Sequence, residues 1–196
     1  MNPLILASKS PRRAEILNFF TLPFIQKSSA FDEYSIQYTG NPKAYVTAIA
    51  SGKSEYSSKK SKPSAIIMAC DTLVFNHEQP LAKPRNLQES KEMLATLSGK
   101  THSVYTAISL RKGSLHLCGI EMSLVSFHKL NQSMIEKYTQ QIFTLDKAGG
   151  YAIQGSGSII VKKIEGCFYN VMGLPIATLS TLLKKIDIDL WDYLKT

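Results

Sequence analysis

Strand-like and helix-like segments alternate along this chain, and this alternation narrows the possible folds more than any other feature. The runs at 64–75 and 115–127 are apolar, as expected for strands. The segments at 86–97 and 174–186 begin at capping or proline residues and carry apolar side chains at helical spacing. No repeat or long linker interrupts the pattern. The sequence therefore predicts an α/β protein with a mixed sheet flanked by helices.

The same signals place the remaining elements. Helices are expected from Pro11, from Pro42 after the capping residue Asn41, and around Ile135 and Tyr138. Two hairpins are expected, with turns at 76–78 and 111–114. The glycine-rich loop at 146–157 matches neither the P-loop nor the dinucleotide fingerprint. The other expected strands are 4–6, 22–25, 103–110 and 158–164.

Composition sets the class of protein. With 196 residues, 44% of them hydrophobic, the chain can bury a core as one domain spanning 1–196. It has no apolar run of about 18 residues, so no membrane span is expected, and its N-terminus lacks the pattern of a secretory signal. The three cysteines show no CxxC spacing and the four histidines no metal-ligand spacing. Reduced thiols in the cytoplasm are therefore expected, and a zinc site is not.

The net charge of +8 predicts an anionic partner. Much of the excess lies in the polar run 53–62, which is typical of a solvated helix end and loop. The run carries a single aromatic residue, whereas binding to single-stranded nucleic acid would need aromatic residues interleaved with the basic ones. The charge is compatible with phosphate groups as ligands.

The start of the first helix is a candidate phosphate site. Ser10 is expected to be its N-cap and Pro11 its first residue, and Arg12 and Arg13 then fall in the first turn. Cations at a helix N-terminus cost about 0.3–1 kcal/mol, unless an anion lies between them and the free backbone amides. A pocket that includes Ser8 would suit a phosphate group. The simpler interpretation is that both arginines are solvated surface residues.

Asp71 is a carboxylate within an otherwise apolar strand. A buried carboxylate has to be paired, metal-bound or protonated, because an unpaired charge in the interior is very costly. A structural role, such as accepting backbone N–H bonds where the strand bends, competes with a functional one.

A set of short motifs points to a family. They occur in the family's order between residues 4 and 183, and on them the chain resembles the Maf nucleotide pyrophosphatases, a family once named for septum inhibition. The motifs are Leu6-Ala7-Ser8-x-Ser10-Pro11-Arg12-Arg13, Asp71-Thr72-x-Val74, Lys83-Pro84, Leu97-Ser98-Gly99-Lys100-Thr101-His102-x-Val104, Asp146-Lys147-Ala148-Gly149-x-Tyr151-x-Ile153-Gln154-Gly155 and Val171-x-Gly173-Leu174-Pro175.

The resemblance implies an elongated, twisted mixed sheet similar to that of the ITPases, with two lobes around a cleft. It implies hydrolysis of a nucleoside triphosphate to the monophosphate and pyrophosphate, with Mg²⁺ or Mn²⁺ as cofactor. A homodimer that needs no nucleic acid is also implied. Arg12, Thr72 and Gln154 stand where the family's branches differ, and they are similar to the branch that acts on dTTP and UTP. The role would be house-cleaning of nucleotide pools, with modified pyrimidine nucleotides as further substrates.

The resemblance also implies roles for individual residues. Asp71 would accept the proton of the attacking water and, together with Glu33, bind the metal. Thr72 and Gln154 would read the base, because a glutamine amide can both donate and accept, as the N3–H and O4 edge of uracil or thymine requires. The residues expected to cradle the triphosphate are Ser8, Arg12, Arg13, Lys53 and Lys83.

Several of these residues have simpler interpretations. Lys53 lies beside the apolar stripe of its helix and would then only extend to solvent. Glu33 would be an exposed loop acid, Lys83 an ordinary turn lysine before a proline, and Gln154 a brace for the glycine-rich loop. Cys70 departs from the family pattern, which has alanine before the aspartate.

Two other functions compete with the pyrophosphatase. One is a non-enzymatic inhibitor of septum formation and cell division that binds a protein or nucleic acid, favoured by the basic charge. A carboxylate buried in a strand would not contribute to binding at such a surface. The other is a phosphatase of different specificity that uses the same pocket.

Overall fold

The computed structural model describes residues 3–195, and its centre is one mixed sheet of seven strands. The strand order is β2-β1-β3-β5-β6-β7, and β4 pairs with β3 outside this path. β1 runs parallel to β2 and β3, whereas the other pairs are antiparallel. The predicted mixed sheet is therefore confirmed. The strands are β1 (Leu4–Leu6), β2 (Phe24–Gln26), β3 (Ile66–Asn76), β4 (Gln79–Leu81), β5 (Thr101–Lys112), β6 (Leu115–Phe127) and β7 (Val161–Glu165).

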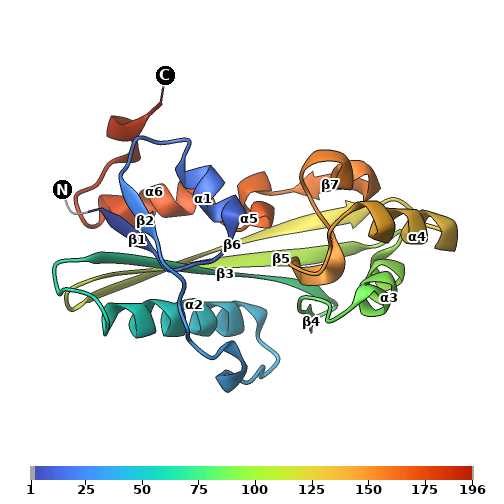
Figure 1. Ribbon diagram of the computed structural model, residues 1–196, viewed down its shortest axis with the longest axis horizontal. Helices are drawn as coiled ribbons and strands as arrows, with labels where there is room; N and C mark the ends of the chain where they lie inside the picture. Colours follow the sequence, from blue (N-terminus) through green and yellow to red (C-terminus); the bar gives the residue numbers. More distant parts are fainter. Residues whose placement is uncertain (1–2, 196) are drawn as a thin grey trace.

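Helices cover both faces of the sheet (Figure 1). One face carries α2, which packs on β3 and β5, while α1, α5 and α6 lie on the other. α3 and α4 pack together at the far end of the long strands. The helices flank the sheet as the sequence predicts; the two-lobed arrangement stays a prediction. The helices are α1 (Pro11–Leu17), α2 (Pro42–Ser58), α3 (Leu87–Leu97), α4 (Gln132–Gln141), α5 (Phe168–Met172) and α6 (Ile176–Lys184), and the 3-10 turns are Glu33–Ser35, Ala148–Gly150, Gly155–Ile160 and Leu190–Tyr193.

Local sequence explains where the helices begin. Asn41, Asn86 and Asn131 each accept a hydrogen bond from a backbone N–H in the first turn of α2, α3 and α4. Ser10 precedes α1 at the N-cap position, but its side chain makes no capping bond. Across residues 3–195, no helix has both the length and the apolar character that crossing a membrane requires.

Two details differ from the sequence prediction. The segment expected as a strand from residue 158 begins as a strand only at Val161, because residues 155–160 form a 3-10 turn. α5 was not expected, since its five residues are too few to show a helical period.

The edge of β3 has a gap that positions the functional residues. On this side β1 pairs with residues 66–68 of β3, and β4 pairs with residues 74–76. Within residues 3–195 no strand pairs with the five positions between them on this side. Asp71 lies at the middle of this gap, just beyond the carboxyl end of β1, and ligands of α/β proteins commonly bind at the carboxyl ends of parallel strands.

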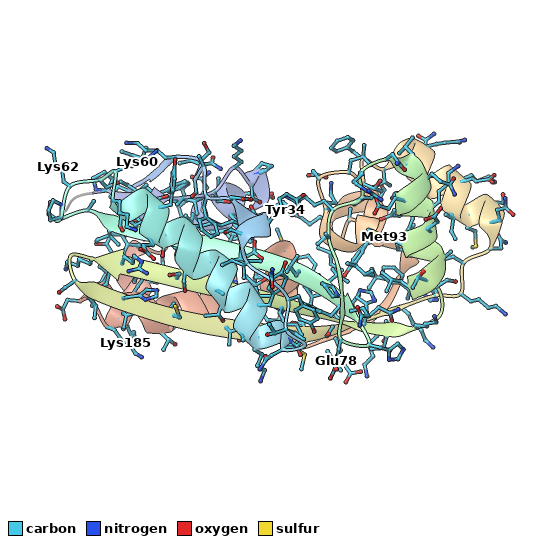
Figure 2. The ribbon with its side chains drawn as sticks, turned by 90° about the horizontal axis from the view of Figure 1, so that it is seen from below. Tyr34, Lys60, Lys62, Glu78, Met93 and Lys185 are labelled. Atoms are coloured by element: carbon cyan, nitrogen blue, oxygen red, sulfur yellow. The ribbon has the colours of Figure 1, made fainter. Side chains whose placement is uncertain are left out.

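The end of the basic run, residues 59–62, lies away from this gap. Figure 2 shows Lys60 and Lys62 at one end of the molecule, whereas Tyr34, in the turn that also contains Glu33, lies near its middle. Lys60 is exposed and lies over the ring of Tyr56, 4.2 Å from its centroid. Residues 59–62 are thus a solvated helix end, as the sequence predicts, whereas Lys53, at the start of the run, has a side chain only 12% exposed.

Candidate functional site

Asp71 is buried and forms an ion pair with Lys53 of α2. Its Oδ1 accepts a hydrogen bond from Lys53 Nζ at 2.7 Å, and the two side chains are only 7% and 12% exposed. The same ammonium reaches Glu33 Oε1 at 2.9 Å. Lys53 therefore does not extend to solvent, and it brings together the two carboxylates that the sequence suggested as metal ligands. Asp71 Oδ2 is buried without a hydrogen-bond partner.

Arg13 is held by three parts of the chain on the opposite face. Its Nη1 donates to Ser8 Oγ at 3.0 Å, and its Nη2 donates to Thr72 Oγ1 at 2.9 Å. Its Nε donates to the carbonyl of Gly173 at 2.9 Å. A guanidinium has five N–H donors, so one donor remains on each Nη atom. The arginine is thus fixed in one orientation with a forked pair of donors left for a ligand.

Ser8 can only donate to a ligand. Its Oγ accepts from the backbone N–H of Ser10 at 3.1 Å and from Arg13 at 3.0 Å, which uses both lone pairs. The hydroxyl hydrogen is left for an acceptor. Ser8 also lines a small cavity of about 50 Å³ together with two of the cations described above. The lining residues are Ala7, Ser8, Lys9, Arg13, Ser29, Lys53 and Cys70.

The gap in the sheet explains how these groups meet. Successive residues of a strand point to opposite faces, so Asp71 faces α2 and Thr72 faces α1 and α5. Where β1 has ended and β4 has not begun, side chains from both faces reach the same cavity. The cavity collects N–H and O–H donors and positive charge. An anion of several oxygens, such as a polyphosphate, is the ligand that matches this set.

Arg12 points to a different partner. Its Nη1 lies 3.1 Å from Asp146 Oδ2, in an ion pair that ties α1 to the glycine-rich loop. Partial burial acts to raise the pKa of Asp146, but hydrogen bonds and charge from Lys147 and Arg12 outweigh it and lower that pKa. Both arginines in the first turn of α1 therefore have partners within the protein. Arg12 has its ion pair with Asp146, and Arg13 has the three hydrogen bonds described above.

Two predicted site residues lie outside this contact network. Gln154 is half-buried and lines an open groove of about 560 Å³, whose lining shares no residue with the small cavity. Phe168, at the start of α5, lines the same groove and is 40% exposed. Lys83 is exposed in the loop after β4.

Cys70 lines the cavity next to Asp71. Burial raises the pKa of its thiol to about 11, so the group is uncharged near neutral pH. The cysteine adds bulk to the cavity wall without adding a negative charge.

The carboxylates suit a hard divalent cation. Among residues 3–195 there is no group of three or more His, Cys, Asp or Glu side chains arranged to hold a metal. Mg²⁺, however, is commonly bound by one or two carboxylates together with substrate phosphates and water. Asp71 and Glu33 supply such a pair.

Sequence reasoning did not find every member of the network. It missed Asp146 as the partner of Arg12, the Gly173 carbonyl as a partner of Arg13, and Thr106, whose Oγ1 lies 2.9 Å from Thr72 Oγ1. Asp146 and Gly173 lie in motifs noted above, which was the available signal. Thr106 carried none, because it lies inside an ordinary strand.

Comparison with known proteins identifies the family. The family described as Maf-like protein matches residues 3–186. The chain belongs to this family, as the motifs indicated.

Relatives of known name cover almost the whole chain. The dTTP/UTP pyrophosphatase of Chlamydia felis (strain Fe/C-56) is 44% identical over 191 residues, 97% of each chain. The protein of the same name from Chlamydia trachomatis serovar D is 40% identical over 191 residues, with the same coverage. The nucleoside triphosphate pyrophosphatase of Chlamydia pneumoniae is 42% identical over 193 residues, again 97% of each chain.

Proposed function

We propose that this protein is a nucleoside triphosphate pyrophosphatase that hydrolyses dTTP and UTP to the monophosphate and pyrophosphate. The observation that carries the proposal is the cavity at the gap in β3, where Ser8, Arg13 and Lys53 lie beside the buried carboxylate of Asp71. The names of its relatives support the reaction and the substrates. A non-enzymatic regulator of cell division is not favoured, because it would not need this arrangement.

The cationic residues would bind and orient the polyphosphate. Arg13 offers a fixed fork of two donors, Ser8 a hydroxyl hydrogen and Lys53 an ammonium. Fixed donors stabilise the charge that develops as the α–β phosphoanhydride bond breaks, without the cost of reorganising water. Lys83 would join them from the loop after β4, and Arg12 would contribute from its ion pair with Asp146.

Asp71 would take the proton of the attacking water. Its Oδ1 is held by Lys53, which fixes the side chain and stabilises its negative charge. Its Oδ2 has no hydrogen-bond partner and is the free acceptor. Asp71 would thus be the catalytic residue, and Lys53 would serve both as its anchor and as a phosphate ligand.

Asp71 and Glu33 would hold the divalent cation, Mg²⁺ or Mn²⁺. When bound, the cation would act as a Lewis acid on the phosphate oxygens. Glu33 is about half exposed and lies in a short turn, so it can approach a ligand in the cavity from the solvent side.

Gln154 and Thr72 would select the base. The Gln154 amide can both donate and accept, as the O4 and N3–H edge of uracil and thymine requires. Thr72 uses one lone pair for Arg13 and keeps a second, which can accept from an N–H group of the ligand. We propose further that the chain acts as a single domain over 1–196 and as a homodimer. The free cysteines suit a reducing compartment such as the cytoplasm.

The substitution Asp71→Asn tests the reaction. It removes the proton acceptor but keeps the shape of the side chain, so pyrophosphate release from dTTP should fall at least about a hundredfold. The assay is pyrophosphate release from a panel of dTTP, UTP, CTP, dATP, dGTP and 5-methyl-UTP, with and without EDTA. Wild-type protein should turn over dTTP and UTP fastest, and EDTA should abolish the activity.

Glu136→Gln is a matched control, since it exchanges a carboxylate for an amide on α4, outside the contacts of the site. It should keep the wild-type rate. Full turnover by Asp71→Asn would overturn the catalytic assignment. A wild-type protein that releases no pyrophosphate from any nucleotide in the panel would overturn the proposed function itself.

A further inference from the structure

Arg13 stands at the end of a chain of hydrogen bonds that runs across one face of the sheet, from β3 to β5, and on to α5. Its Nη2 lies 2.9 Å from Thr72 Oγ1, which lies 2.9 Å from Thr106 Oγ1 on the neighbouring strand β5. Thr106 Oγ1 in turn lies 2.7 Å from the backbone carbonyl oxygen of Asn170. Thr106 is fully buried, so its hydroxyl has no solvent contact to exchange for these bonds.

The direction of every bond in this chain is fixed. A carbonyl has no hydrogen to give, so Thr106 must use its only hydroxyl hydrogen on Asn170. The contact between the two threonines therefore needs the hydrogen of Thr72. Thr72 in turn can only accept from Arg13. The order is Arg13 N–H to Thr72, Thr72 O–H to Thr106, and Thr106 O–H to the Asn170 carbonyl.

The far end of the chain is anchored firmly. Asn170 is fully buried, and its Nδ2 donates to the carbonyl of Val104 at 3.0 Å and to Ser123 Oγ at 2.9 Å. These bonds pin α5 to β5 and β6, on which it packs beside α1 (Figure 1). Asn170 Oδ1 is buried without a partner, a costly arrangement that the fold retains.

The same helix end supplies a second bond to the arginine. Gly173 follows α5 and its carbonyl accepts from Arg13 Nε at 2.9 Å. Two nitrogens of the guanidinium are thus connected to α5. Nε bonds directly to the carbonyl that follows the helix, and Nη2 is linked to the helix through the two threonines. This arrangement sets the plane in which the two remaining N–H donors of Arg13 enter the cavity.

We propose that Thr106 and Asn170 are positioning residues for substrate binding, because the chain they complete sets the orientation of Arg13. They touch no ligand and act only through the arginine. The inference rests on the proposed function, in which Arg13 binds the polyphosphate. It assigns a role in that function to Thr106 on β5 and to the backbone carbonyl of Asn170 on α5.

The substitution Thr106→Val tests this inference, since it keeps the shape and removes the hydroxyl. The readouts are the Kd for inorganic triphosphate, measured by calorimetric titration in EDTA, and the KM and kcat for dTTP. The Kd and the KM should rise about tenfold, in keeping with the loss of well-directed bonds to a charged group, and kcat should change less. Thr106→Ser keeps the hydroxyl and should bind triphosphate within about threefold of wild type.

Thr139→Val is the matched control for loss of a buried hydroxyl. Thr139 lies on α4, is 5% exposed, and bonds only to carbonyls of its own helix. This variant should show normal triphosphate binding even where it is as destabilised as Thr106→Val. The pair Thr106→Ala and Thr106→Ser, which differ only in the hydroxyl, repeats the comparison without a methyl group against the Asn170 carbonyl.

A double-mutant cycle tests the chain itself. Thr72→Val breaks it one step nearer to Arg13, so adding Thr106→Val should weaken triphosphate binding no further. The inference is overturned if Thr106→Val and Thr106→Ala bind triphosphate like wild type, if Thr139→Val loses binding equally, or if the two threonine effects add. Binding does not require turnover, so an inactive wild type that still shows these effects would reject the reaction and keep the positioning role.

Discussion

At the scale of single residues, the buried pair of Lys53 and Asp71 governs both stability and chemistry. The side chains are 12% and 7% exposed, so neither charge has much water around it. Removing one partner of a buried pair leaves an uncompensated charge, which costs more than the pair itself contributes. Lys53 is therefore a structural partner of Asp71 as well as a candidate ligand for phosphate.

The substitution Lys53→Met should lower the free energy of unfolding by about 3 kcal/mol, because it strands the Asp71 charge. The double substitution Lys53→Met with Asp71→Asn should recover most of that loss. Urea unfolding at pH 7 measures both.

Lys59→Met provides the comparison at the surface. Lys59 forms a pair with Glu55 on the same helix and is 72% exposed, so its loss should change stability by less than about 0.5 kcal/mol. Equal effects of the Lys53 and Lys59 substitutions would contradict the account of the buried pair, as would a double variant no more stable than Lys53→Met.

Part of this site could be predicted from the sequence. A carboxylate inside an apolar strand demands a partner, and the position of Lys53 beside the apolar stripe of α2 made it available. The partner of Arg12 could not be predicted from spacing, because Asp146 lies 134 residues away and only the fold brings them together.

At the scale of elements, the N-caps divide into two kinds. Asn86 and Asn131 accept a backbone N–H of α3 and α4 at 2.9 Å, whereas Ser10 makes no capping bond at the start of α1. The first turn of α1 is held by tertiary contacts of its arginines instead.

The substitutions Asn86→Ala and Asn131→Ala should therefore each lower the free energy of unfolding by about 1 kcal/mol, and Ser10→Ala should leave it nearly unchanged. Thermal or urea unfolding of the three variants checks the prediction. A loss in Ser10→Ala as large as in the asparagine variants would show that the serine caps α1 after all.

Elements with strong local signals were predictable, and those formed by context were not. α2, α3 and the β5–β6 hairpin have caps, stripes or turn residues that mark them in sequence. Leu87, the first residue of α3, is 49% exposed. α5 forms where Asn170 and Gly173 tie it to neighbours distant in sequence, and no local signal reports that.

At the scale of the whole molecule, a buried histidine links stability to pH. His102 on β5 is 2% exposed and packs edge-on against the rings of Phe127 and Tyr151, with its Nε2 2.9 Å from the Tyr151 hydroxyl. Burial lowers the pKa of His102 to about 4, from an ordinary value of about 6.5. The folded protein therefore keeps this ring neutral over a range where the unfolded chain protonates it.

Because the unfolded state binds the extra proton between those two values, stability should fall as the pH drops from about 6.5 toward 4, by roughly 3 kcal/mol. His102→Gln cannot take up the proton, so its stability should depend less on pH over this window. Urea unfolding at pH 7, 5.5 and 4.5 measures the difference.

His128→Gln is the control, since His128 is exposed and its exchange should keep the wild-type slope. Parallel stability profiles for His102→Gln and wild type would contradict the assignment of the acid-sensitive step to His102.

The class of fold followed from the sequence, but the order of the strands did not. Turn residues in the sequence indicate which neighbouring strands pair as a hairpin, as at 76–78 and 111–114. The insertion of β1 between β2 and β3 depends on which edges remain free once the long strands have paired, and no local pattern records that. The gap in β3 that holds the site is a product of this order.

The contact between Arg13 and the Gly173 carbonyl joins positions 160 residues apart. During translation, the arginine is synthesised 160 residues before its carbonyl partner. A nascent chain therefore holds Arg13 without the carbonyl that helps to orient it until α5 and Gly173 have emerged.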